Sequence, residues 1–219
     1  DLRRRLKPSD RRCFGFFHPS MPNEPLIFVE VALTRGVPGS VQGLLADERG
    51  IIEAVAADTA VFYSISNCQS GLAGISFGNS LIKQVVADLS RELPNLKTFV
   101  TLSPIPGLNR WLKETERPDV SADDTRQRQC AAHYILKAKR QDGLPYDPVA
   151  RFHLGNGALV HAVHSNADMS ENGVEQSGGA MVNYLYDLSL IFQNHERFAS
   201  AQEVVASPQV TALSVTVET

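Results

Sequence analysis

Hydrophobic residues in the first half of the chain follow two different spacings. Runs that are almost continuously apolar and rich in β-branched residues are typical of strands covered on both faces. Such runs predict strands over residues 26–33, 60–66 and 98–102. Apolar residues with helical spacing, which end before Pro94, predict an amphipathic helix over residues 81–93. The alternation of strands with a helix indicates an α/β fold.

Shorter elements are predicted from less regular patterns. Ser40 is positioned to cap a short helix that ends at Ala46. Residues 114–129 are polar, and we expect them to be exposed or mobile. The composition of the second half predicts a helix over 131–139, a strand over 157–164, a glycine-rich loop over 170–179, a helix over 181–192, and strand-like segments over 204–205 and 210–217. The chain contains no internal repeat, and we predict one α/β domain.

The charge of the chain argues against a nucleic-acid-binding role. Its 21 lysines and arginines are outnumbered by 24 aspartates and glutamates, so the formal net charge is -3 and the pI is near 6.1. Such a chain has no overall basic field with which to neutralise phosphates. An anionic ligand must instead be held by a few basic side chains or by backbone amides at a helix N-terminus.

The cysteines and the apolar runs indicate in which cellular compartment the protein is expected. Cys13, Cys68 and Cys130 lack the C-x-x-C pairing of zinc and dithiol sites, and we interpret them as reduced thiols, although one exposed cysteine suffices for a disulfide between subunits. No apolar run approaches the roughly 20 residues that span a bilayer, and no secretory pattern is present. We therefore expect a soluble, cytoplasmic protein without membrane partners. Because the chain opens with Asp1 in a charged stretch, we also expect that an N-terminal portion is missing.

A loop of small residues lies between a predicted strand and the predicted helix over 81–93. It contains Ala73, Gly74, Ile75, Ser76, Phe77, Gly78 and Asn79. Glycines at such a position let backbone N–H groups approach a pyrophosphate, and the helix dipole favours its charge. The loop lacks the lysine of the G-x-x-x-x-G-K-[ST] motif and the full G-x-G-x-x-G fingerprint. Its nearest match is the degenerate pyrophosphate loop of acetyltransferase-like CoA-binding folds, and a flexible helix start is the alternative.

Ser103 and His153 are the two side chains best suited to proton chemistry. Ser103 begins the Ser-Pro-Ile-Pro-Gly segment over 103–107, where a stiff backbone at a sheet end would hold its hydroxyl. His153 precedes an Asn-Gly turn, and histidine exchanges protons near neutral pH. Each has a structural alternative, because serine before proline is a common turn residue and a lone histidine is commonly a hydrogen-bonded structural residue.

The remaining histidines and tyrosines give weaker signals. His161 and His164 share a predicted strand, but their three-residue offset places them on opposite faces, so we predict no metal site. Tyr184 and Tyr186 lie in the predicted helix over 181–192. Each can offer a phenol to a ligand or pack in the core with its hydroxyl at the surface.

Several short motifs follow one another along the chain. They are Phe62-Tyr63-Ser64-Ile65-Ser66, Gly71-Leu72-x-Gly74, Leu81-Ile82-Lys83, Leu102-Ser103-Pro104-Ile105-Pro106-Gly107, Phe152-His153-Leu154-x-Asn156-Gly157-Ala158 and Asn183-Tyr184-x-Tyr186. Taken together, these motifs resemble malonyl-CoA decarboxylase in their order and context. The early strand that ends in Val31-Ala32-Leu33-Thr34 fits as well. The resemblance covers most of the chain.

This resemblance implies a catalytic domain over residues 1–219 with an acetyltransferase-like (GNAT-like) fold, a mixed sheet flanked by helices. It also implies a preceding helical domain, absent from this chain, through which the family forms homo-oligomers, either dimers or tetramers. The implied reaction converts malonyl-CoA to acetyl-CoA and carbon dioxide without a metal or an organic cofactor. The catalytic serine and histidine of the family fall on Ser103 and His153, its active-site tyrosine on Tyr186, and its CoA-pyrophosphate loop on residues 73–79.

Two features depart from the family pattern. Ser76 stands where mammalian members carry a glutamate that lines the site, so that contact is missing or supplied differently here. The polar stretch between Ser103 and His153 is also shorter than in those members, which suggests a trimmed bacterial form or omitted residues.

The expected reaction leaves an enolate whose charge lies largely on the thioester oxygen, so the enzyme must stabilise that oxygen and protonate the α-carbon. We assign Ser103 to hydrogen-bonding of the carboxylate or to a proton relay, and His153 to the acid that stabilises or protonates the enolate. The rival functions are a CoA-dependent N-acyltransferase and a non-catalytic acyl-CoA sensor.

Overall fold

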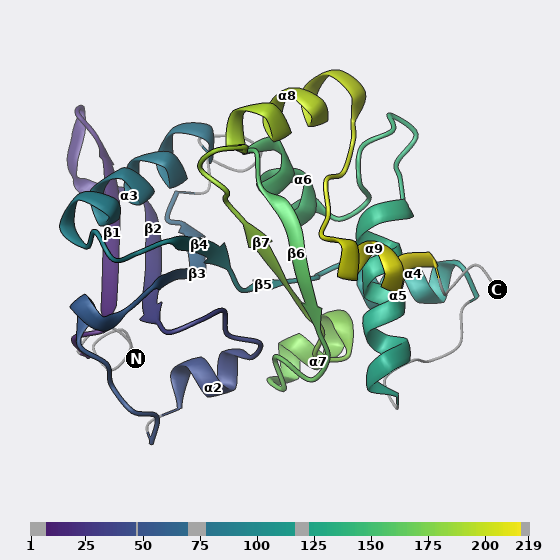
Figure 1. The fold of residues 1–219 in the computed structure, drawn as a ribbon. Helices are drawn as coiled ribbons and strands as arrows, with labels where there is room; N and C mark the ends of the chain where they lie inside the picture. Colours follow the sequence, from purple (N-terminus) through teal and green to yellow (C-terminus); the bar gives the residue numbers. More distant parts are fainter. Residues whose placement is uncertain (1–7, 47, 70–77, 117–122, 216–219) are drawn as a thin grey trace. The chain divides into compact units, whose positions relative to one another are not determined.

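The structure is a computed structural model that describes residues 8–46, 48–69, 78–116 and 123–215. These residues form two compact units (Figure 1). The first unit takes its residues from 1–38 and 44–101, and the second from 39–43 and 102–219. Both units contain strands and helices, as the α/β prediction requires.

Four strands of the first unit form a mixed sheet. In order, they are β1 (Arg11–His18), β2 (Met21–Thr34), β3 (Thr59–Asn67) and β4 (Thr98–Thr101). β1, β2 and β3 pair antiparallel, whereas β4 runs parallel to β3. The three strands predicted in this half of the chain are confirmed. β1 was not predicted, because its residues alternate between half-buried and exposed positions and form no continuous apolar run.

Helix α3 (Gly78–Glu92) makes the crossover that joins β3 to the parallel strand β4, and it lies across one face of these strands (Figure 1). Its apolar stripe is buried and comprises Leu81, Ile82, Val85, Val86 and Leu89. The predicted helix is therefore confirmed, but it begins earlier than expected. Gly78 and Asn79 belong to its first turn rather than to a loop. The N–H groups of a first turn have no intrahelical partner, and glycine is tolerated at such positions.

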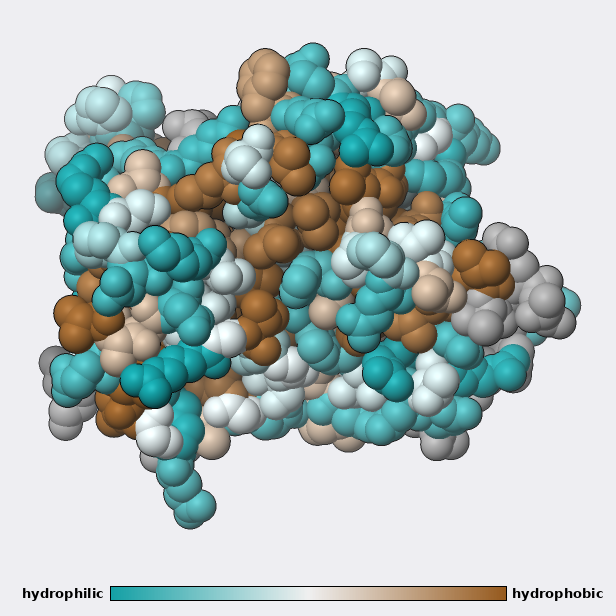
Figure 2. All heavy atoms as spheres, in the orientation of Figure 1, coloured by the Kyte–Doolittle hydropathy of each residue, from teal (hydrophilic) through white to brown (hydrophobic). Residues whose placement is uncertain are grey.

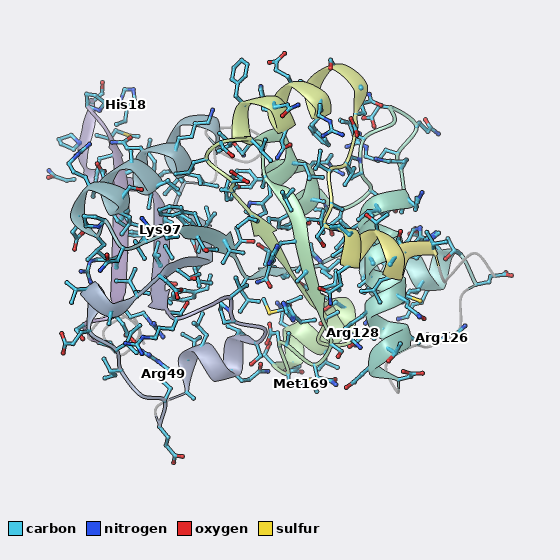
Figure 3. All side chains as sticks on the ribbon, viewed as in Figure 1. His18, Arg49, Lys97, Arg126, Arg128 and Met169 are labelled. Carbon is cyan, nitrogen blue, oxygen red and sulfur yellow. The ribbon has the colours of Figure 1, made fainter. Side chains whose placement is uncertain are left out.

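A buried carboxylate anchors the connection that follows α2 (Val41–Leu45). Arg49 lies between α2 and the short 3-10 helix η1 (Ala54–Ala56) (Figure 3). It donates two hydrogen bonds to the fully buried Asp10, at 2.5 Å from Nη1 to Oδ2 and 2.8 Å from Nη2 to Oδ1. Such two-pronged pairs fix geometry as well as adding energy.

We expect Arg49→Ala to lower the free energy of unfolding by about 1.5–3 kcal/mol, the usual effect of removing hydrogen bonds to a charged group. Urea unfolding measures this loss. The matched control is Arg12→Ala, because Arg12 pairs with Glu92 on the exposed surface, where such pairs contribute about 1 kcal/mol or less. Equal losses in the two variants would contradict a special role for the buried pair.

The second unit combines short antiparallel strands with helices. The strands, in order, are β5 (Ser103–Pro104), β7 (Met181–Leu185) and β6 (Leu159–His164). The helices are α4 (Leu108–Glu114), α5 (Asp124–Lys137), α6 (Pro148–Gly155), α7 (Glu171–Ser177), α8 (Ile191–Ala201) and α9 (Pro208–Val215). The strand predicted over 157–164 is confirmed as β6.

Helix α5 begins earlier than the predicted helix over 131–139. Asp123 caps it by accepting hydrogen bonds from the backbone N–H groups of Thr125 and Arg126. Arg126 is exposed on this helix, whereas Arg128 is half-buried. Figure 2 shows hydrophilic residues spread over much of the face drawn, interspersed with hydrophobic ones. Across the described part of the chain, every helix is too short or too polar to cross a membrane.

Three predictions in this unit were wrong. The loop predicted over 170–179 contains helix α7, because Ser170 caps its start and Gly178, with φ at 65°, ends it in the left-handed conformation. The strand-like segment over 210–217 lies largely in helix α9, where the Ser207 hydroxyl accepts a hydrogen bond from the Val210 N–H. In both cases a capping side chain decides the structure.

The third error is the helix predicted over 181–192. Residues Met181–Leu185 form strand β7, which pairs with β6 on one side and with β5 at Ser103 and Pro104. Asp187 ends this stretch with a turn, in which its carboxylate accepts the Ser189 N–H, and α8 begins only at Ile191. Pairing with strands distant in sequence outweighed the local pattern.

Candidate active site

Ser103 is held by pairing with β7 rather than by a turn. It lies opposite Val182 in the two-residue strand β5, and only 5% of its surface is exposed. Pro104, which has no N–H to donate, is exposed beside it, as expected of a strand at the edge of a ladder. The prediction that Ser103 follows a strand end is confirmed, since β4 stops at Thr101.

His153 lies in the last turn of helix α6, for which the sequence analysis predicted no element. The helix is well specified locally: Asp147 is its N-cap, its carboxylate accepts the Ala150 N–H at 2.8 Å, and Pro148 occupies the first turn. The imidazole is buried, with 3% of its surface exposed.

The structure brings Ser103, His153 and Tyr186 into one hydrogen-bonded chain. Ser103 Oγ is 3.1 Å from Nε2 of His153. On the other side of the ring, the Tyr186 hydroxyl is 2.7 Å from Nδ1. Side chains 50 and 33 residues apart in sequence are thus linked through both nitrogens of a single imidazole.

Tyr184 completes the surroundings of the imidazole. Its ring stacks on that of His153 with centroids 4.6 Å apart and an interplanar angle of 26°. Phe152 meets the same imidazole edge-on at 5.0 Å. Tyr184 and Tyr186 both reach His153 because residues two apart in an extended segment point to the same side, whereas in the predicted helix they would diverge.

Burial sets the protonation states of the groups in this hydrogen-bonded chain. It lowers the pKa of His153 to about 3, because the charged imidazolium loses its hydration. The same desolvation raises the pKa values of Tyr184 and Tyr186 well above that of a free tyrosine. Near neutral pH the serine, the imidazole and the phenols are therefore all uncharged.

A neutral imidazole carries one proton, and its two tautomers differ in what they offer to Ser103. If the Tyr186 hydroxyl donates to Nδ1, the proton on Nε2 points at Ser103 Oγ, and the serine hydroxyl can donate onward. If Nδ1 carries the proton, Nε2 accepts the serine proton instead. Either arrangement can move a proton along the chain without forming a buried charge at rest.

The other candidate residues are placed less fully. The predicted CoA-binding residues 73–77, which include Ser76, lie outside the described residues, whereas Gly78 and Asn79 begin helix α3. The His164 imidazole is hydrogen-bonded through Nε2 to the side-chain oxygen of Asn183. Within the described ranges, no three metal-ligating side chains gather in one place.

Asp147 was missed by the sequence analysis. It is buried, with 1% of its surface exposed, and it caps the helix that carries His153. The available signal was the Asp147-Pro148 pair, an N-cap residue followed by proline at the first helical position. That signal predicts the helix, but it does not reveal that the carboxylate is buried.

Comparison with known proteins identifies the family. The model of the malonyl-CoA decarboxylase C-terminal domain matches residues 1–130 and 124–218. The malonyl-CoA decarboxylase of Anser anser anser, named as mitochondrial, is 34% identical over 96% of this chain and 51% of its own length. The chain therefore spans about half the length of this curated relative.

Solved structures agree with this assignment. The malonyl-CoA decarboxylase of Rhodopseudomonas palustris is 50% identical, with a TM-score of 0.88 over 97% of this chain and 55% of that chain. The GphF GNAT-like decarboxylase, solved in complex with isobutyryl-CoA, is 19% identical with a TM-score of 0.56 over 84% of this chain and 82% of that chain, and it shows the shared fold. The predicted GNAT-like fold and the predicted family are thus confirmed, and the chain belongs to the malonyl-CoA decarboxylase family.

Proposed function

We propose that this chain converts malonyl-CoA to acetyl-CoA and carbon dioxide, with Ser103, His153 and Tyr186 as its catalytic residues. The observation that carries the proposal is the buried chain of hydrogen bonds through both nitrogens of His153, in a member of this family. A buried relay of uncharged groups suits a reaction that needs one proton delivered away from bulk water.

The reaction breaks the bond between the carboxylate carbon and the α-carbon of the malonyl group. Carbon dioxide leaves, and the electron pair passes to the α-carbon and the thioester oxygen as an enolate. A proton then adds to the α-carbon to give the acetyl group. Catalysis therefore requires donors aimed at the developing oxyanion and a proton source close to the α-carbon.

We assign the proton donor role to Ser103. His153 is neutral before the reaction, because burial lowers its pKa. A neutral imidazole can still donate a hydrogen bond through its one N–H. Because Ser103 Oγ is hydrogen-bonded to Nε2, the serine hydroxyl is the last group of the hydrogen-bonded chain. Ser103 gives its proton to the α-carbon and takes one from Nε2, while Nδ1 takes the proton of the Tyr186 hydroxyl. A proton from solvent then neutralises the Tyr186 phenolate and resets the hydrogen-bonded chain.

We further propose that the reaction uses no metal and no organic cofactor. The thioester carbonyl itself accepts the electron pair, so no separate electron sink is required. Residues 73–79 are proposed to hold the CoA pyrophosphate through backbone N–H groups at the start of α3, which would fix the malonyl group with its carboxylate out of the thioester plane.

The test is turnover of malonyl-CoA by the full-length protein in heavy water after treatment with a chelator. We expect acetyl-CoA that carries one solvent deuterium in its methyl group, because a single proton is added to the enolate. Carbon dioxide release without an added amine distinguishes this reaction from N-acyl transfer. Tight binding of malonyl-CoA without carbon dioxide release would instead indicate a sensor and would overturn the proposal.

We expect Tyr186→Phe to lower kcat by about 10-fold or more, because it removes the hydroxyl bonded to Nδ1 while keeping the ring. Steady-state kinetics measure the change. Tyr146→Phe is the matched control, since the Tyr146 hydroxyl bonds the exposed Glu114. If both variants keep wild-type kcat, Tyr186 takes no part in the relay.

Assembly and location are also proposals. We propose a homo-oligomer, a dimer or a tetramer, formed through a helical domain outside this chain, and light scattering on the full-length protein tests it. We propose a cytoplasmic location, which cell fractionation tests. The goose relative is named as mitochondrial, so recovery in an organelle fraction would contradict this proposal.

A further inference from the structure

We propose that Asp147 is a positioning residue that sets the alignment of Ser103 with His153. Its carboxylate interacts with the chain on both sides of the catalytic pair, by a hydrogen bond at the start of the His153 helix and by proximity to Gly107 and Tyr134 at the end of the segment that follows Ser103. This inference rests on the proposed decarboxylase function.

The first set of contacts fixes the helix that carries His153. The Ala150 N–H donates to Asp147 Oδ1 at 2.8 Å, and the Val149 N–H, in the same turn, also lowers the pKa of the carboxyl group. His153 lies six residues after this cap, less than two turns along α6. The orientation of the cap therefore fixes where the imidazole is presented.

The second set of contacts fixes the segment that follows Ser103. The Gly107 backbone N–H is near enough to the same carboxylate to lower its pKa, and Gly107 lies directly against the Tyr134 hydroxyl, which is 3.5 Å from Asp147 Oδ2. Gly107 ends the Ser-Pro-Ile-Pro-Gly segment and precedes helix α4, and two prolines within four residues leave the backbone little freedom between Ser103 and this anchor. One side chain thus ties together two segments that are 40 residues apart in sequence.

Tyr134, in helix α5, also contacts the Asp147 carboxylate. Its hydroxyl is 3.5 Å from Asp147 Oδ2, and both side chains are buried. A Cβ atom added to Gly107 would overlap that hydroxyl, so glycine is the residue that lets the tyrosine and the loop approach the carboxylate together.

The burial of Asp147 indicates that its charge serves more than a helix cap. Desolvation raises the pKa of its carboxyl group, although the backbone donors oppose this shift. A capping residue does not require such burial, because Asp123 caps helix α5 with an exposed carboxylate. What distinguishes Asp147 is its additional contact with the segment around Gly107 and Tyr134.

Asp147→Asn tests this link with a side chain of the same shape. The amide oxygen can keep the bond from the Ala150 N–H, but the amide nitrogen then faces donors where the carboxylate accepted them. We expect the Gly107 anchor to loosen while the helix cap remains. The expected result is a fall in kcat of about 10- to 100-fold, since small misalignments of reacting groups have effects of this size.

The experiment measures steady-state decarboxylation by the full-length protein for Asp147→Asn, Ser103→Ala and the double variant. Asp123→Asn is the matched control, and circular dichroism checks folding. We expect KM for malonyl-CoA to stay within about twofold, because the proposed CoA contacts lie in residues 73–79. If Asp147 acts through Ser103, Asp147→Asn should add less than about a twofold loss in the Ser103→Ala background.

Gly107→Ala provides a second route if Ser103→Ala is too slow to measure, because its added methyl group would overlap the Tyr134 hydroxyl and displace the loop from the carboxylate. The double variant Asp147→Asn with Gly107→Ala should then be no slower than the poorer single variant. The inference is overturned if Asp147→Asn lowers kcat by the same factor in every background, or if the Asp147→Asn single variant keeps the wild-type kcat. Lack of turnover by the unmodified protein would instead overturn the proposed function.

Discussion

Replacing Ser103 with alanine is expected to lower kcat for malonyl-CoA decarboxylation by about 10²- to 10⁴-fold, the usual contribution of a positioned proton donor. The variant removes the only atom through which Ser103 meets Nε2 of His153, at 3.1 Å, and leaves the backbone pairing of β5 in place. KM should change little, because the proposed CoA contacts involve other residues.

Steady-state rates and isotope incorporation together measure this effect. In heavy water, the wild-type protein should place one deuterium in the product methyl group, and Ser103→Ala should slow this step. Ser214→Ala is the control, because Ser214 is a buried serine whose hydroxyl bonds a backbone carbonyl in helix α9. Comparable losses of kcat in the two variants would show that burial rather than chemistry explains the result.

The catalytic candidates were predictable because their signals are local. Ser103 stands between a β-branched run and two prolines, and His153 stands before an Asn-Gly turn. Such patterns fix where a strand stops and where a turn follows. Their proximity was not visible in the pattern, and it was predicted through the family resemblance alone.

Local patterns failed where distant pairing decides the structure. Residues 181–185 have no strong alternation, and only pairing with β5 and β6 makes them a strand. This error hid the way in which Tyr184 and Tyr186 reach the same imidazole, one through its face and the other through Nδ1. Side chains two residues apart point to the same side of a strand but to different sides of a helix.

Asp147 illustrates a second limit of sequence patterns. An aspartate before a proline predicts a helix start, and helix α6 does start there. The contacts with Gly107 and Tyr134 depend on folding that brings residues from three segments together. Caps can be predicted from sequence, whereas the additional partners of a capping side chain cannot.

Replacing His153 with alanine is expected to abolish the relay and to lower kcat by about 10²- to 10⁴-fold. His153→Gln separates two contributions, because its amide can still offer an N–H toward Ser103 but cannot pass a proton to a second partner. We expect His153→Gln to keep more activity than His153→Ala. If it is equally slow, the exchange of protons between Nε2 and Nδ1 matters more than the hydrogen bond to Ser103.

The same residue predicts how stability depends on pH. In the folded protein the pKa of His153 is about 3, whereas an exposed histidine has a pKa of about 6.5. Between these values the unfolded chain binds a proton at His153 and the folded chain does not. The free energy of unfolding should therefore fall as pH decreases from about 6.5 toward 3, by up to about 1.4 kcal/mol per pH unit from this group. Urea unfolding at several pH values measures the slope, which should be smaller in His153→Gln because glutamine does not titrate. An unchanged slope would show that folding does not lower the pKa of His153, and burial of the neutral imidazole would then not be the source of the pH dependence.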